Sequence, residues 1–171
     1  MTPNPVIRLT GVLQTLEHVV FPAVDPTNSL AQEQCGLVLA QLRMMIGHLP
    51  WIGAYHSLCF DDAAATVAAL PQAEGGPATL AAGAGLAKAL EEARTSGDPQ
   101  EGFHTLGHGM DALLRALAGD GAPDYRRAAE RAIFAFSQRQ NLRARSWFAE
   151  AGFDPAPEQV PAYADMITAG L

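Results

Sequence analysis

The sequence predicts an all-α fold, a single domain over residues 1–171 in which six to seven helices pack as a mostly antiparallel bundle. Along most of the chain, apolar residues recur at spacings of three and four, which is the period of one helix face. We find no run that alternates apolar and polar residues as a half-buried strand does. The breaks between the helical segments are mostly short, as between antiparallel neighbours.

The first two helices are predicted over residues 5–20 and 29–49. The apolar face of the first consists of Val6, Leu9, Leu13, Leu16 and Val20. The second begins at Ser29, which forms a capping box with Gln32. It ends before Pro50, because proline cannot continue the hydrogen-bond ladder of a helix.

A third helix is predicted from Pro50, which suits a first helical position, to about residue 59. The pair Asp61–Asp62 then indicates a break or a new N-cap before the Ala-rich residues 63–70. Residues 71–77 are rich in proline and glycine, and we expect a mobile connection there.

Four segments follow in the second half of the chain. Residues 78–94 are Ala-rich and favour a helix. Asp98 is the expected N-cap of a helix over residues 99–118, with Pro99 in its first turn. A long helix over residues 124–149 and a short one over residues 158–168 complete the prediction.

The composition restricts the partners of this protein. Only 17% of the residues are charged while 49% are apolar, so apolar surface must remain unless the chain self-associates, and we expect a homodimer. The net charge of −7 argues against nucleic-acid binding, which depends on basic residues. No uninterrupted apolar run reaches the length of a membrane span. The two cysteines have no secretory context, so the expected location is the cytoplasm.

A polar stripe on the predicted helix 99–118 offers a metal site. His104, His108 and Asp111 follow one another at spacings of four and three, which places them on one side of a helix. Imidazoles and a carboxylate are ligands for zinc or iron, and further ligands would have to come from other helices. The alternative is a solvated face, in which Asp111 pairs with Arg115 one turn away.

An arginine-rich helix offers an anion site. Arg139 and Arg143 fall on or beside the apolar stripe of the predicted helix 124–149, together with Trp147. They could bind a carboxylate or phosphate of a small ligand, with Trp147 covering its apolar part. Two alternatives remain open: pairing with an internal carboxylate such as Glu33 or Asp61, or a helix break near residues 137–141 that returns both arginines to solvent.

Two functions are compatible with these patterns. The first is a non-catalytic helical module that dimerises or docks onto a partner, favoured by the low charge and the lack of a recognisable nucleophile with its base. The second is a ligand-binding or metal-binding protein, or an enzyme, that uses His104, His108 and Asp111 or the pocket of Arg139, Arg143 and Trp147. The sequence does not identify a cofactor, a substrate or a reaction.

Overall fold

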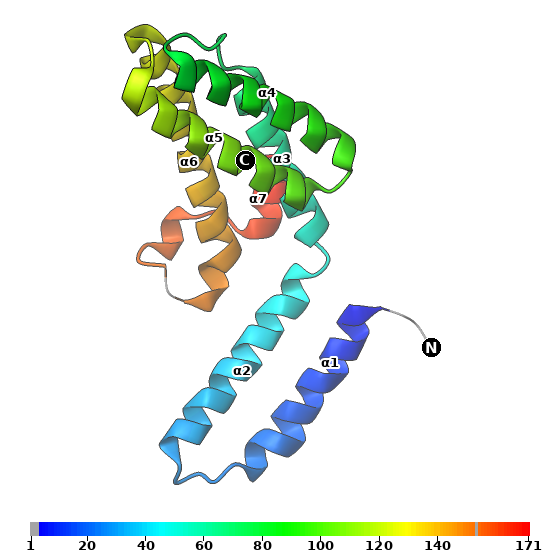
Figure 1. Cartoon of the computed structure of the whole chain (residues 1–171). Coiled ribbons are helices and arrows are strands. Elements are labelled where there is room, and N and C mark those ends of the chain that lie inside the picture. Colours follow the sequence, from blue (N-terminus) through cyan, green and yellow to red (C-terminus); the bar gives the residue numbers. More distant parts are fainter. Residues whose placement is uncertain (1–3, 153) are drawn as a thin grey trace.

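The computed structural model describes residues 4–152 and 154–171, and these form seven α-helices and no strand. This confirms the predicted all-α bundle. The helices divide into two groups (Figure 1): a hairpin of α1 (Pro5–Thr15) and α2 (Ser29–His48), and a body of the remaining five helices that lies at the C-terminal end of α2.

The hairpin begins with a helix whose described residues include none that is fully buried. A π turn (Leu16–Val20) and a 3-10 turn (Phe21–Ala23) continue α1 before the chain reverses into α2. Helix α1 packs against α2; of the predicted apolar face, Val6, Leu9, Leu13 and Leu16 are half-buried and Val20 is exposed. Helix α2 itself is one uninterrupted helix of 20 residues. Its N-cap is Asn28 rather than the predicted Ser29, because the Asn28 side chain accepts a hydrogen bond of 3.0 Å from the Ala31 amide.

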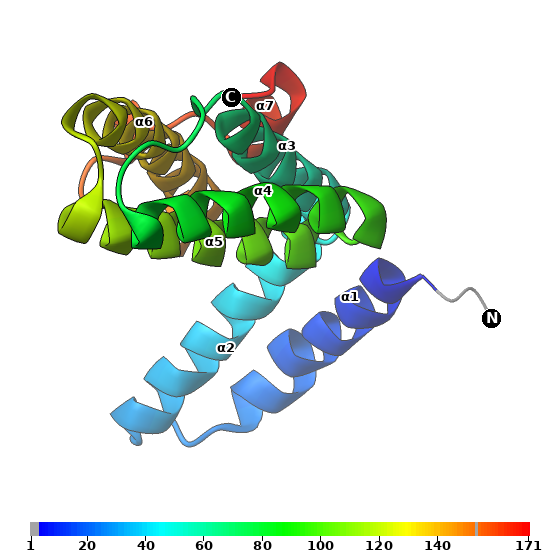
Figure 2. The same ribbon diagram turned by 45° about the horizontal axis from the view of Figure 1, so that its top comes forward.

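The body is built around α5 (Pro99–Asp120), which packs against α4 (Pro77–Ser96) and α3 (Ile52–Ala68), while α6 (Pro123–Phe148) and the short α7 (Tyr163–Ala169) complete it (Figure 2). Burial of apolar area holds these helices together. The core is aliphatic at its centre and includes Val67, Leu86, Leu90, Leu106, Met110, Leu113, Leu117, Tyr125, Ala129, Ile133 and Phe136.

Two glycines allow α5 to approach its neighbours closely. A Cβ on Gly109 would lie 2.6 Å from the Leu86 side chain of α4, and one on Gly102 would lie 2.7 Å from the Phe60 ring of α3. Both distances are shorter than van der Waals contact permits, so larger residues would push the helices apart. Gly107, beside His108, has open space around it and no such role.

The caps of α5 tie the body together. At its start, the predicted N-cap Asp98 accepts hydrogen bonds from the amides of Gln100 and Glu101. At its end, Asp120 accepts bonds from the amides of Ala78 and Thr79 and so caps α4 from another helix. The Thr79 hydroxyl also donates to Asp120 at 2.6 Å, and this bond together with the two amide bonds lowers the pKa of the Asp120 carboxyl.

Two predicted interruptions are wrong. Helix α3 runs through Asp61–Asp62 without a break, and α6 runs through residues 137–141. Asp62 of the first segment and Arg139 and Gln140 of the second form tertiary hydrogen bonds instead of local caps. Among the described helices, no single one is long and apolar enough to cross a membrane; α2 and α3 reach that length together only as a pair bent by 69°.

Candidate functional site

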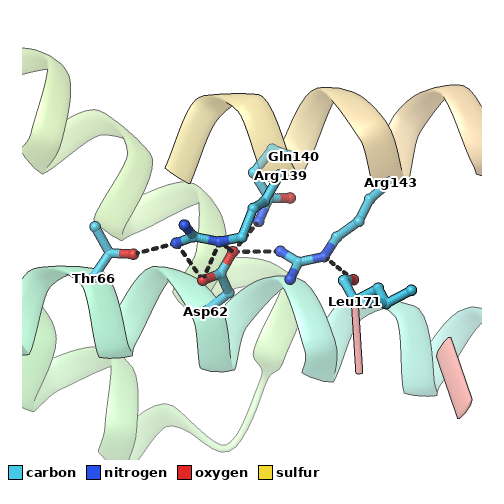
Figure 3. A network of polar contacts seen from close by, with 6 residues as sticks. All are labelled: Asp62, Thr66, Arg139, Gln140, Arg143 and Leu171. Atoms are coloured by element: carbon cyan, nitrogen blue, oxygen red, sulfur yellow. Dashed lines mark hydrogen bonds and ion pairs between the residues drawn. The ribbon is translucent and has the colours of Figure 1, made fainter. Parts of the chain in front are cut away.

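The strongest polar constellation lies between α3 and α6. Asp62, on α3, receives hydrogen bonds from two arginines of α6: Arg139 Nη2 lies 2.7 Å from Asp62 Oδ1, and Arg143 Nη1 lies 2.5 Å from Asp62 Oδ2 (Figure 3). Gln140 Nε2 donates to the same carboxylate at 3.3 Å. The carboxylate therefore joins the middle of α3 to the second half of α6.

The two arginines differ in their exposure and in their other partners. Arg143 is 2% exposed, and its Nε also donates to the main-chain oxygen of Leu171 at 2.6 Å, so it anchors the C-terminal end of the described chain. The Arg139 side chain is 44% exposed, and it also donates to the Thr66 hydroxyl. Arg143 is the structural member of the pair, because a buried guanidinium must be matched by acceptors.

The ionisation of Asp62 reflects this environment. Burial by itself raises the pKa of its carboxyl, but the hydrogen bonds from Arg139 and Arg143 lower it by more, and the net pKa lies below the usual value. The hydrogen bond between Arg139 and Asp62 also raises the pKa of Arg139. Asp62 and Arg139 are therefore both charged at neutral pH.

The arginines are thus paired internally, which was one of the open alternatives. The partner is Asp62, and neither Glu33 nor Asp61 takes that place. With Asp62 in position, a diffusible anion would have to displace a carboxylate that both guanidiniums already hold. The anion pocket of Arg139 and Arg143 stays a prediction.

A small pocket of about 150 Å³ lies beside this network. It is lined by Tyr55, His56, Cys59, Gln100, Phe103, His104 and Gln140. Two histidines and a thiol thus share one hollow between α3 and α5. Burial raises the pKa of the Cys59 thiol, so the sulfur is protonated at neutral pH and is a weak nucleophile. The volume is well below the roughly 300 Å³ at which small-molecule sites begin.

A larger groove of about 530 Å³ lies on the other side of the body. It runs along α4 beside the end of α3 and the loop that follows, and its floor consists of aliphatic side chains with Tyr125. The few polar side chains in its wall include Gln72 and Glu91. A specific ligand site needs several convergent polar groups, and this groove offers too few to indicate a ligand.

Comparisons with protein-family models, with curated proteins and with solved structures found no match for this chain. The site must therefore be interpreted from its geometry alone.

The residues of the predicted metal site lie on one helix, α5. His104 and His108 are exposed, and Asp111 forms an ion pair with Arg115 one turn along α5. Within residues 4–152 and 154–171, no three side chains of the types His, Cys, Asp and Glu are grouped so that they could hold a metal ion. The geometry is that of the solvated face named above as the alternative, with His104 alone reaching the rim of the small pocket.

Trp147, named in the anion-pocket hypothesis, belongs to an aromatic cluster. Its ring packs on His48, with ring centroids 4.2 Å apart, and on Tyr55 at 4.3 Å. Tyr163 meets His48 edge-on at 4.5 Å and donates from its hydroxyl to the Gly47 carbonyl. This aromatic cluster joins the end of α2 to α3, α6 and α7, so it is the joint between the hairpin and the body.

His48 is the unusual member of the cluster. It is 5% exposed, and its Nε2 atom has no hydrogen-bond partner among the described residues. Burial lowers the pKa of His48, while the nearby Glu150 raises it by less. The folded protein therefore favours the neutral imidazole.

We expect this imidazole to make stability pH-dependent. The pKa of His48 in the folded protein lies below the unfolded value of about 6.5. Its contribution to the free energy of unfolding is therefore complete above that pH and is lost as the pH falls toward the folded pKa. The melting temperature of the wild type should fall between about pH 7.5 and pH 5, and His48→Phe should flatten that dependence. Exposed His108→Phe is the control and should keep the wild-type slope. An unchanged slope in His48→Phe would refute the assignment.

Sequence reasoning missed Asp62 and His48. A signal for Asp62 was present, since Cys59, Asp62, Ala63 and Thr66 follow the spacing of one helix face. An aspartate on that face requires a cation as its partner, because the face is buried. Asp61 lies outside this face. For His48 no local signal exists, because its aromatic partners lie about 100 residues away along the chain and meet it only in the folded state.

Proposed function

We propose that this protein is a helical module that dimerises, and that the α1–α2 hairpin is the element that docks. The observation that carries the proposal is the apolar surface of the hairpin. Eight of the thirteen large apolar side chains that are exposed in the described residues lie between residues 7 and 45: Ile7, Val12, Val19, Val20, Leu30, Leu37, Val38 and Met45.

The hairpin cannot bury this surface by itself. Two helices share one contact face, and Leu30, Leu37, Val38 and Met45 of α2 stay exposed although α1 packs against that helix. Between the end of α1 and α2 lies a shallow apolar groove of about 160 Å³, whose lining includes Val20, Phe21 and Val38. A four-helix arrangement closes such a core, and a second hairpin supplies the two missing helices.

The oligomeric state tests the proposal. Light scattering after size exclusion, at micromolar concentration and over a dilution series, should give twice the mass of one chain. Leu37→Glu should shift the protein to monomer, because a charge in the apolar interface loses its hydration. Leu80→Glu is the matched control: Leu80 is 48% exposed and Leu37 46%, but Leu80 lies on α4 outside the hairpin.

Either of two results would contradict this function. One is a wild type that remains monomeric at every concentration. The other is a dimer that Leu80→Glu dissociates and Leu37→Glu does not, which would place the interface on the body.

A further inference from the structure

The exposed side of α2 contains one continuous apolar sector. The side that faces α1 includes Cys35, Leu39 and Leu42, of which Leu39 is 6% exposed. At about 100° per residue, a different sector contains the exposed apolar residues. This sector, which we call the outer face, consists of Leu30, Gln34, Leu37, Val38, Gln41 and Met45.

The outer face is symmetric about the middle of α2. Leu30 and Met45, Gln34 and Gln41, and Leu37 and Val38 lie at equal distances on either side of the point between residues 37 and 38. A two-fold axis at this point would place the first residue of each pair opposite the second residue of that pair in the other copy, so that the two residue numbers always add up to 75. Apolar side chains then meet apolar ones, and an amide that both donates and accepts meets another amide.

The body decides the direction of pairing. His48 lies 18 residues after Leu30, which is five complete helical turns, so both project from the same side of α2. The body lies at the C-terminal end of α2 (Figure 1), and Trp147 of α6 packs there on His48, on the same side of the helix as the outer face. Two parallel α2 helices would bring both bodies to the same place. Two antiparallel helices place each body beyond the N-terminal end of the other α2.

We propose that α2 pairs antiparallel with α2 of a second copy, with Leu30 opposite Met45 and Leu37 opposite Val38. This inference rests on the proposed dimerisation and adds its partner surface and register. Antiparallel pairing also sets the opposite ends of the two helix dipoles side by side.

Disulfide cross-linking tests the register. The background is Cys35→Ala, with Cys59 left in place because it is buried. Leu30→Cys and Met45→Cys are made as separate proteins, oxidised alone and as a mixture after subunit exchange, and analysed on non-reducing gels. Both positions are more than half exposed, so the fold tolerates them, and circular dichroism checks this.

The proposed register gives covalent dimers in the mixture and none from either variant alone. In that register, two copies of either position lie about 22 Å apart along the helix, whereas a disulfide requires Cα atoms within about 7 Å. Leu80→Cys in the same background is the control and should not cross-link.

Other outcomes overturn the register. Cross-linking of each variant by itself means parallel helices. A dimer by light scattering that cross-links in no combination means another interface. Both results leave the proposed dimerisation intact, whereas a monomer at every concentration refutes both proposals.

Discussion

Replacing Asp62 with alanine should lower the free energy of unfolding by about 3–5 kcal/mol, among the largest effects of any single substitution in this chain. The variant keeps Arg143 buried at 2% exposure and removes the carboxylate that Arg143 contacts at 2.5 Å. The Leu171 main-chain oxygen would remain as a partner, but it accepts from Nε and leaves Nη1 without the acceptor that Asp62 provides. Chemical denaturation at neutral pH measures the loss.

The matched control is the exposed ion pair on α5. Asp111 pairs with Arg115, and their side chains are 55% and 76% exposed, so Asp111→Ala should change stability by less than about 1 kcal/mol. Asp62→Leu combined with Arg143→Met should recover much of the loss, because it removes both buried charges together. A loss below about 1 kcal/mol for Asp62→Ala would show that the network contributes little.

The same network has a defined acid dependence. The folded pKa of Asp62 lies below its unfolded value of about 3.9, so its contribution to the free energy of unfolding is complete at neutral pH and is lost as the pH falls through the folded pKa.

Arg143→Met also tests the predicted anion site. If Asp62 is the only anion that the arginines bind, phosphate at matched ionic strength should not stabilise the wild type relative to this variant.

Leu106→Ala should cost about 2–5 kcal/mol of unfolding free energy. Leu106 is fully buried at the centre of α5, where the core of the body meets, and truncation leaves a cavity that the packed neighbours cannot fill. Leu80→Ala removes the same atoms from a side chain that is 48% exposed, and it should change stability by less than about 0.5 kcal/mol. Equal effects of the two substitutions, measured by urea denaturation, would mean that the core is placed wrongly.

Features that depend on residues close together in the sequence were predictable, whereas features that depend on distant residues were not. The α2 helix and the Asp98 cap of α5 were predictable, because periodicity and capping depend on residues within a few positions of one another. The predicted break at Asp61–Asp62 was wrong because long-range contacts decide the structure there. An aspartate pair is typical of a helix start, but Asp62 binds arginines 77 and 81 residues away, and those bonds outweigh the local preference for a cap.

For the candidate sites, too, the sequence predicted the position of each side chain on its helix but not the partner that lies opposite it. The histidine stripe is correct as a helix face, but whether a face binds metal depends on what stands opposite it, and His104, His108 and Asp111 have no completing ligand among the described residues. Arg139 and Arg143 were recognised as out of place on an apolar stripe, while their shared partner was not. A charge on a buried face predicts that a partner exists, and only the packing of α3 on α6 identifies it.

By itself the sequence determined the helical class and the order of the helices, since both follow from spacing along one chain. Only the tertiary structure decided that α1 and α2 extend from the body as a hairpin, and that His48 is buried among aromatic rings at its base. The physical reason is that amphipathic spacing specifies which side of a helix must be covered, whereas the cover comes from distant residues or from another copy of the chain.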